Sequence, residues 1–172
     1  MAEPLRLGRR ACPPLFLSLR REEMQFVKES VIRASPERVF GFHEQPNVLS
    51  LLIPPWENAR GVRPTRISEL GTQAVVELRV FGPVTVRWIA QHTVYDPPHM
   101  FEDVQIKGPF RKWRHRHIVK PDPNGAMLRD EIDYVPPLGF LGCVVAPSFI
   151  QQRLQKLFDY RHEVTRHWCE ER

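Results

Sequence analysis

Apolar and polar residues alternate along the middle of the chain in runs of roughly a dozen residues, the pattern of strands with one buried face. Within one such run, Ala74 and Val76 alternate with polar neighbours. Turns such as Gly82-Pro83 separate the runs, because proline removes a donor that a central strand needs. The pattern predicts antiparallel strands over residues 24–33, 71–81, 84–95, 100–107, 111–120 and 126–135, with a ragged strand near 57–66.

Helical signals occur in two parts of the chain. Ser35 precedes Pro36, the order of an N-cap residue and a first-turn proline, and this helix is expected to run to about His43. A shorter helix is expected over residues 47–52. The proline-free C-terminus predicts one long amphipathic helix over residues 148–172, whose apolar positions are Ile150, Leu154, Leu157, Val164 and Trp168.

This order of elements predicts an α+β fold of the helix-grip kind. A curved antiparallel sheet of about six or seven strands would wrap around the long C-terminal helix, with two short helices after the first strand. Residues 1–22 are rich in arginine and have no periodicity. We expect them to be a flexible basic tail, or to precede a natural start near Met24, and residues 23–172 to form the domain.

Composition narrows the class of protein. The chain has 172 residues, of which 42% are hydrophobic and 26% charged, enough for one domain with a sizeable core. No run of about 18 apolar residues is present, so no membrane span is expected. Cys12, Cys143 and Cys169 are too few and too scattered for a disulfide framework, which favours the cytoplasm. A net charge of +5, spread along the chain, does not predict a nucleic-acid partner.

Four segments resemble one family. They are IRASPERVFGFHEQP (32–46), FEDVQIKGPFRKWRHRH (101–117), DYVPPLG (133–139) and LFDYRHEVT (157–165). They are similar to the SRPBCC superfamily, also called START-like or birch-pollen-allergen-like, and within it to the bacterial ligand-binding "cyclase/dehydrase" branch. The resemblance implies a helix-grip fold with a hydrophobic cavity for lipids, polyketides or other ring-bearing molecules. It implies no cofactor.

Alternation also assigns the faces of the strands. Trp113, His115 and His117 share one face, and the arginines between them form the solvated outer face. Asp130 and Tyr134 are expected to point inward from the strand 126–135. The strand 100–107 stays open: hydrophobicity favours an inward set of Glu102, Val104 and Ile106, whereas the resemblance favours Phe101, Asp103 and Gln105.

These faces give the candidate ligand-binding residues, which are Asp103, Gln105, Phe110, Trp113, His115, His117, Asp130, Tyr134, Leu138 and Arg161. Arg161 interrupts the apolar stripe of the long helix, so it either pairs with Asp103 or Asp130 or extends to solvent. His115 and His117 are close enough to suggest a metal, but no third ligand at a defined spacing accompanies them, and no metal site is predicted.

Three functions are compatible with this pattern. The first is binding of a small hydrophobic molecule between sheet and helix, by a monomer or homodimer. The second is a cyclase- or dehydratase-type lyase, in which His115 or His117 moves protons and Asp130 positions the imidazole. The third is an accessory protein whose cavity is filled by Phe101, Trp113, Tyr134 and Phe158. Residues 136–147 would be an apolar lid or a packed connection, facing a rim of Leu51, Leu52, Ile53 and Trp56.

Overall fold

The computed structural model describes residues 23–61, 66–81, 84–136 and 147–171. The elements are β1 (Met24–Ile32), α1 (Pro36–His43), α2 (Val48–Leu51), β2 (Ala59–Gly61), β3 (Gln73–Phe81), β4 (Val84–Asp96), β5 (Met100–Lys107), β6 (Lys112–Asp122), β7 (Gly125–Val135) and α3 (Pro147–Glu170). The strands form one antiparallel sheet in the order β1-β7-β6-β5-β4-β3-β2. The proposed tail, residues 1–22, lies outside the described residues.

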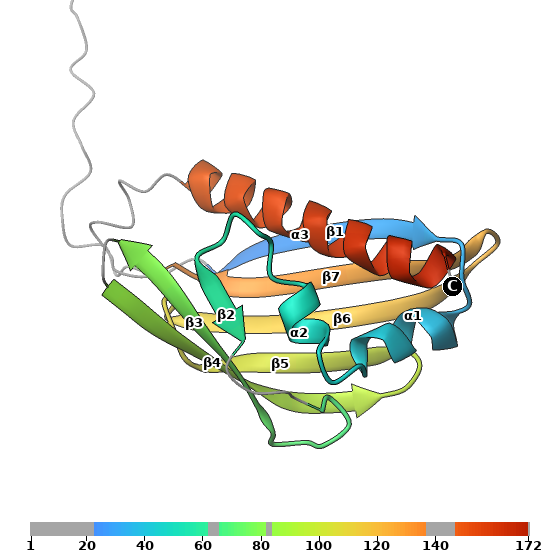
Figure 1. The fold of residues 1–172 in the computed structure, drawn as a ribbon, viewed down its shortest axis with the longest axis horizontal. Coiled ribbons are helices and arrows are strands. Elements are labelled where there is room, and N and C mark those ends of the chain that lie inside the picture. Colours follow the sequence, from blue (N-terminus) through green and yellow to red (C-terminus); the bar gives the residue numbers. More distant parts are fainter. Residues whose placement is uncertain (1–22, 62–65, 82–83, 137–146, 172) are drawn as a thin grey trace, which may run out of the picture.

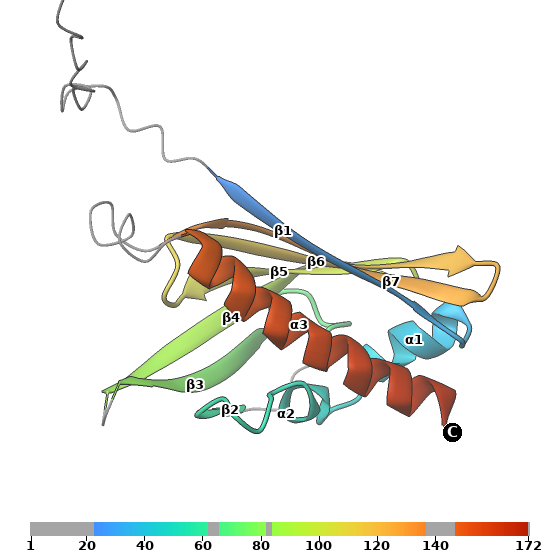
Figure 2. The ribbon, with the colours of Figure 1, turned by 90° about the horizontal axis from the view of Figure 1, so that it is seen from above.

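The sheet curves around α3, as the helix-grip prediction requires. Figure 1 shows α3 crossing one face of the sheet, and Figure 2 shows β3 and β4 bending toward the helix side. The helices α1 and α2 lie on that same side, beside the C-terminal half of α3. The predicted α+β fold is therefore confirmed. Within the described residues, no helix is both long and apolar enough to cross a membrane.

The local signals that predicted the first helix are also confirmed. Ser35 has extended backbone angles, and its side chain accepts a hydrogen bond from the Arg38 amide at 3.3 Å. This bond satisfies one of the amide groups that a helix start leaves without a partner. Pro36 then occupies the first helical position, where its missing amide costs nothing.

The buried face of α3 agrees only in part with the predicted apolar positions. The residues that become buried are Leu154, Phe158, His162, Thr165 and Cys169. Of the other predicted positions, Leu157 and Val164 are only partly buried and flank this face. The buried face therefore includes a histidine, His162, that the apolar pattern did not mark.

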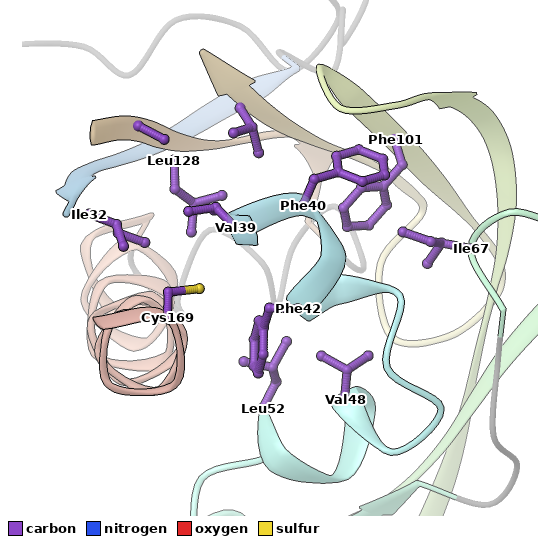
Figure 3. Packing of buried hydrophobic residues seen from close by; sticks show 12 residues of the cluster. Ile32, Val39, Phe40, Phe42, Val48, Leu52, Ile67, Phe101, Leu128 and Cys169 are labelled. Atoms are coloured by element: carbon purple, nitrogen blue, oxygen red, sulfur yellow. The ribbon is translucent and has the colours of Figure 1, made fainter. Parts of the chain in front are cut away.

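Two apolar clusters fill the two ends of the interior. One, drawn in Figure 3, joins α1 to the ends of β6 and β7 and includes Phe40, Phe42, Phe101, Leu128 and Cys169. The other joins the opposite end of the sheet to the start of α3 and includes Phe26, Trp113, Tyr134, Leu154 and Phe158. Three of the four side chains expected to close the cavity thus meet in one cluster, and the fourth, Phe101, belongs to the other.

Candidate functional site

Five ionisable side chains occupy the interior between the two apolar clusters. They are Asp103 on β5, His115 and His117 on β6, Asp130 on β7 and His162 on α3, and we call them the carboxylate–histidine cluster. The sheet register brings four of them together, since Asp103 pairs with His115 and Asp130 with His117. Directly paired residues in an antiparallel sheet leave it on the same face, so all four side chains point toward α3.

The cluster settles the register of β5, which alternation left open. Phe101 is 3% exposed and Ile106 is 54% exposed, so Phe101, Asp103 and Gln105 form the inward set. The register favoured by hydrophobicity is wrong. On the outer face Glu102 accepts a hydrogen bond from Thr93 and lies near Arg114. Ile106 therefore points outward, because the inner face of β5 carries Asp103, a member of the polar cluster.

Asp130 is the centre of the cluster. Its Oδ1 lies 2.8 Å from His115 Nε2 and 2.7 Å from His117 Nδ1, the second contact being out of line for a hydrogen bond. Its Oδ2 lies 2.7 Å from Nε2 of His162, whose other nitrogen meets Ser30 Oγ at 2.8 Å. One buried carboxylate therefore orients three imidazoles drawn from two elements.

Asp103 closes the other side of the histidine pair. Its Oδ2 lies 3.6 Å from His115 Nδ1 and 3.5 Å from His117 Nε2. The two imidazoles are thus held between two carboxylates, with one ring nitrogen of each facing Asp130 and the other facing Asp103. Phe101 stacks on the His117 ring at 4.0 Å between centroids, which fixes the plane of that ring.

Burial and mutual charge set the protonation of the cluster. Burial alone would raise the pKa of Asp130, but the charge of His117 and the hydrogen bonds from His115 and His162 outweigh it and hold that pKa well below its usual range. Burial opposes protonation of His117, yet Asp130 and Asp103 raise its pKa. Burial and the neighbouring His117 lower the pKa of His115. Of the two imidazoles that lie between Asp103 and Asp130, His117 is therefore the one whose protonated form its surroundings favour.

Gln105 has a structural role at the turn after β5. Its side-chain amide donates to the Phe110 carbonyl at 2.6 Å and accepts from the Phe110 amide at 3.3 Å. A Cβ atom on Gly108 would lie 2.3 Å from Gln105 Oε1, so glycine leaves room for this arrangement. Gln105 was one of the predicted ligand residues, but its polar groups hold Phe110 in position.

Aromatic side chains form a wall next to the cluster. Trp88 on β4 contacts Phe110 and Trp113, with ring centroids 5.8 and 4.9 Å apart. Phe110 also meets Tyr134, whose hydroxyl accepts a hydrogen bond from Gln151 on α3 at 3.1 Å. The sequence pattern predicted Phe110, Trp113 and Tyr134 as ligand residues but not Trp88, although Trp88 and His92 occupy alternate positions of β4 with Ala90 between them.

Polar atoms of Trp88 and His92 are buried without a partner. Neither Trp88 Nε1 nor either ring nitrogen of His92 finds a hydrogen-bonding group among the described residues. Such atoms cost about 1–3 kcal/mol each. His92 is buried and pairs with Asp103 across β4 and β5, so its side chain lies on the inner face beside the cluster.

Arg161 does not pair with Asp103 or Asp130. Its Nε donates to the carbonyl oxygen of Leu52 at 3.2 Å, and its guanidinium lies 5.1 Å from the centroid of the Phe158 ring. Among the described residues, no carboxylate comes within ion-pair distance of it. Burial lowers its pKa. The carboxylate Asp130 is satisfied from α3 by His162, one residue further along.

An open surface pocket of about 580 Å³ lies between the C-terminal half of α3 and the α1–α2 segment. Its lining comprises Phe42, Leu51, Tyr160, Glu163, Val164, His167, Trp168 and Glu171. It differs from the predicted position between helix and sheet. Of the predicted rim, Leu51 lines it, and Trp56 packs against Tyr160 at 5.2 Å. Leu138 and most of the proposed lid, residues 137–146, lie outside the described residues.

The arginines of β6 lie on the outer face, as alternation predicted. Arg114 and Arg116 both contact Asp133 Oδ2, at 2.7 and 2.9 Å. Arg116 also pairs with Glu131 at 3.0 Å. Neighbouring carboxylates therefore balance the basic run of the sequence.

The fold is shared with several solved structures. Protein CV1439 from Chromobacterium violaceum superposes with a TM-score of 0.65 at 13% identity, over 85% of this chain and 96% of that one. A START superfamily protein from Mycobacterium smegmatis gives 0.59 at 13% identity, over 87% and 97%. The di-domain aromatase/cyclase StfQ of the steffimycin biosynthetic pathway gives 0.66 at 10% identity, over 88% of this chain and 52% of that one.

At these identities the structures establish a common fold alone. No curated protein matches the sequence. The family profile described as "Polyketide cyclase / dehydrase and lipid transport" matches residues 32–160. That span runs from the end of β1 into α3 and contains the aromatic wall and four members of the carboxylate–histidine cluster. The chain therefore belongs to the polyketide cyclase/dehydrase and lipid transport family.

Proposed function

We propose that the protein binds a small, largely apolar molecule whose polar group reaches Trp88 and His92. The observation that carries this proposal is the set of buried nitrogens on these two residues that have no partner within the described structure. A hydroxyl or carbonyl oxygen on a ligand would accept from Trp88 Nε1, and His92 can donate or accept. Binding would then recover the free energy that these groups lose on burial.

The surroundings of these groups suit a ring-bearing ligand. Trp88, Phe110 and Trp113 present aromatic surface beside them, and a buried aromatic contact adds about 0.5–1.5 kcal/mol beyond the area it covers. The family description covers both polyketide chemistry and lipid transport, and StfQ belongs to a biosynthetic pathway. These parallels support an apolar polyketide-like or lipid-like molecule.

Native mass spectrometry of freshly purified protein, followed by solvent extraction, tests the proposal. We expect a stoichiometric bound mass, or uptake of an environment-sensitive apolar dye such as 1-anilinonaphthalene-8-sulfonate by the empty protein. An empty protein that takes up no apolar probe would refute ligand binding and favour the accessory function.

A matched pair of tryptophan variants locates the site. Trp88→Phe removes the Nε1–H group and keeps most of the ring, so we expect affinity for a bound ligand to fall about five- to tenfold, the loss of one neutral hydrogen bond. Trp56→Phe makes the same change at a half-exposed residue that packs against Tyr160 on α3, and affinity should not change. Equal effects from both variants would place the ligand elsewhere.

A cyclase- or dehydratase-type reaction is the second candidate, and the position of His117 between two carboxylates, which raise its pKa, favours it. An imidazolium held between two carboxylates can act as a general acid, with Asp130 setting its orientation. Once a ligand is identified, His117→Gln separates the two functions. A carrier should keep its affinity within a few-fold, whereas an enzyme should lose turnover by about 10²–10⁴-fold, the usual contribution of general acid–base catalysis.

A further inference from the structure

We propose that Asp103, His115 and His117 form a binding site for a divalent transition-metal ion of the Zn²⁺ type. One ligand atom from each residue, namely a carboxylate oxygen and two ring nitrogens, lies within 4.8 Å of the other two. All three residues are on adjacent strands, β5 and β6, so the sheet itself holds the ligands in position. The three ligand residues differ from Trp88 and His92, the residues that the small molecule proposed above would reach.

The distances fit a shared ion better than direct hydrogen bonds. Asp103 Oδ2 is 3.6 Å from His115 Nδ1 and 3.5 Å from His117 Nε2, whereas an N–H···O bond is about 2.7–3.2 Å. Two ligands that each lie about 2.0–2.1 Å from a tetrahedral zinc ion are about 3.4 Å apart. The separations are therefore those of two edges of a coordination tetrahedron.

Asp130 supplies the outer support that histidine ligands need. Its Oδ1 lies 2.8 Å from His115 Nε2 and 2.7 Å from His117 Nδ1, the nitrogens that face away from Asp103. The hydrogen bond between His115 Nε2 and Asp130 keeps the proton of His115 on that nitrogen and leaves the Nδ1 lone pair for the metal. The charge of Asp130, 2.7 Å from His117 Nδ1, favours the same arrangement in His117. Two such lone pairs and an oxygen of Asp103 then face one another, an arrangement that a cation stabilises. His162 in turn holds the second oxygen of Asp130.

The neighbouring His92 is a second observation that points to a missing polar group. It is buried, it pairs with Asp103 across the sheet, and neither ring nitrogen has a partner in the part of the chain that the structure describes. A metal ion with three protein ligands keeps an open position for water. The imidazole of His92 can hydrogen-bond such a water.

Metal titration of chelator-treated protein tests the site. We expect one equivalent of Zn²⁺ by isothermal titration calorimetry, and visible absorption bands of tetrahedral Co²⁺ when Co²⁺ is the probe. Asp103→Asn and His117→Gln should each weaken Zn²⁺ binding by at least about 100-fold, and Asp130→Asn by about 10–100-fold, the usual effect of an outer-shell carboxylate.

Two matched controls should bind as the unchanged protein does. Glu102→Gln alters the carboxylate next to Asp103 that faces outward, and His99→Gln alters an exposed histidine. Saturable binding that survives both Asp103→Asn and His117→Gln, or no saturable binding at all, would overturn the proposal. In the latter case the cluster holds a proton and no metal.

X-ray absorption at the zinc edge provides a test that needs no variant. The zinc-loaded protein should show nitrogen and oxygen ligands, with the multiple-scattering pattern of two imidazoles and no sulfur. A shell that contains sulfur, or a single imidazole, would place the ion at a cysteine or a surface histidine and refute this site.

Discussion

Asp130→Asn is the perturbation that most directly tests whether the carboxylate–histidine cluster is one coupled unit. Asp130 is 3% exposed and meets three imidazoles within 2.8 Å. An asparagine keeps the shape, removes the charge and turns one acceptor oxygen into an NH₂ donor. At least one imidazole N–H then loses its acceptor, and the His117 imidazolium loses its nearest counter-charge.

The expected cost follows from that geometry. Removing one partner of a buried ion pair typically destabilises a protein by about 3–5 kcal/mol, a large part of the total of about 5–15 kcal/mol for a domain. Asp159→Asn is the matched control. Asp159 is 51% exposed, pairs with Lys28 at 2.5 Å and should contribute about 0–1 kcal/mol.

Urea unfolding at pH 7 with a chelator present measures both variants, followed by circular dichroism and tryptophan fluorescence. A loss of about 3 kcal/mol or more for Asp130→Asn is expected, and a variant too unstable to show a folded baseline also meets that expectation if Asp159→Asn stays folded. A loss below about 1.5 kcal/mol would refute the argument. It would mean that Asp130 is solvated or that its neighbours rearrange without cost.

Three further changes have defined outcomes. Gly108→Ala should cost about 1–2 kcal/mol in urea unfolding because the new Cβ displaces Gln105, and the same change in a Gln105→Leu background should cost clearly less. Burial, then the charge of His117, lowers the pKa of His43 from 6.5 to about 3. Protonation therefore favours the unfolded chain, and stability present above pH 6.5 is lost as the pH falls. Relative to His43→Met, the unchanged protein should lose up to about 1.4 kcal/mol per pH unit below 6.5, and parallel profiles would refute this. Burial raises the pKa of the Cys169 thiol to about 11. When the other two cysteines are replaced by serine, a thiol reagent at pH 8 should therefore react with Cys169 no faster than the protein opens locally. Rapid labelling would show that the end of α3 frays.

The helices and strands could be predicted because the signals that mark them come from residues close together in the sequence. Turn residues and period-two alternation fixed the strands from β3 to β7, and Ser35 with Pro36 marked the start of α1. Helical spacing and the absence of proline indicated α3. Each of these depends on a few neighbouring residues and on whether one face is buried.

The site was harder to predict because hydrophobic patterning assumes an apolar interior. On β5 that assumption selected the wrong face, since the inward positions include Asp103 whereas Ile106 is exposed. On α3 it marked apolar positions such as Leu154 and gave no reason to place a histidine on the same face, and so His162 was missed. The contact between His162 and Asp130 joins residues 32 positions apart, and neither spacing nor composition reveals such a pair.

The position of the cluster argues against a purely structural role. Along β6 the inward residues run from Trp113 through His115 and His117 to Val119, so ionisable groups interrupt an otherwise continuous apolar core. Replacing a buried ion pair by packed apolar side chains is often neutral or stabilising by about 1–4 kcal/mol, so stability alone gives no reason for the interruption. A bound ion, a bound polar group or a transferable proton would each make use of two carboxylates held around two imidazoles. The metal titration, the Trp88→Phe affinity and the His117→Gln turnover in metal-free protein test these three uses.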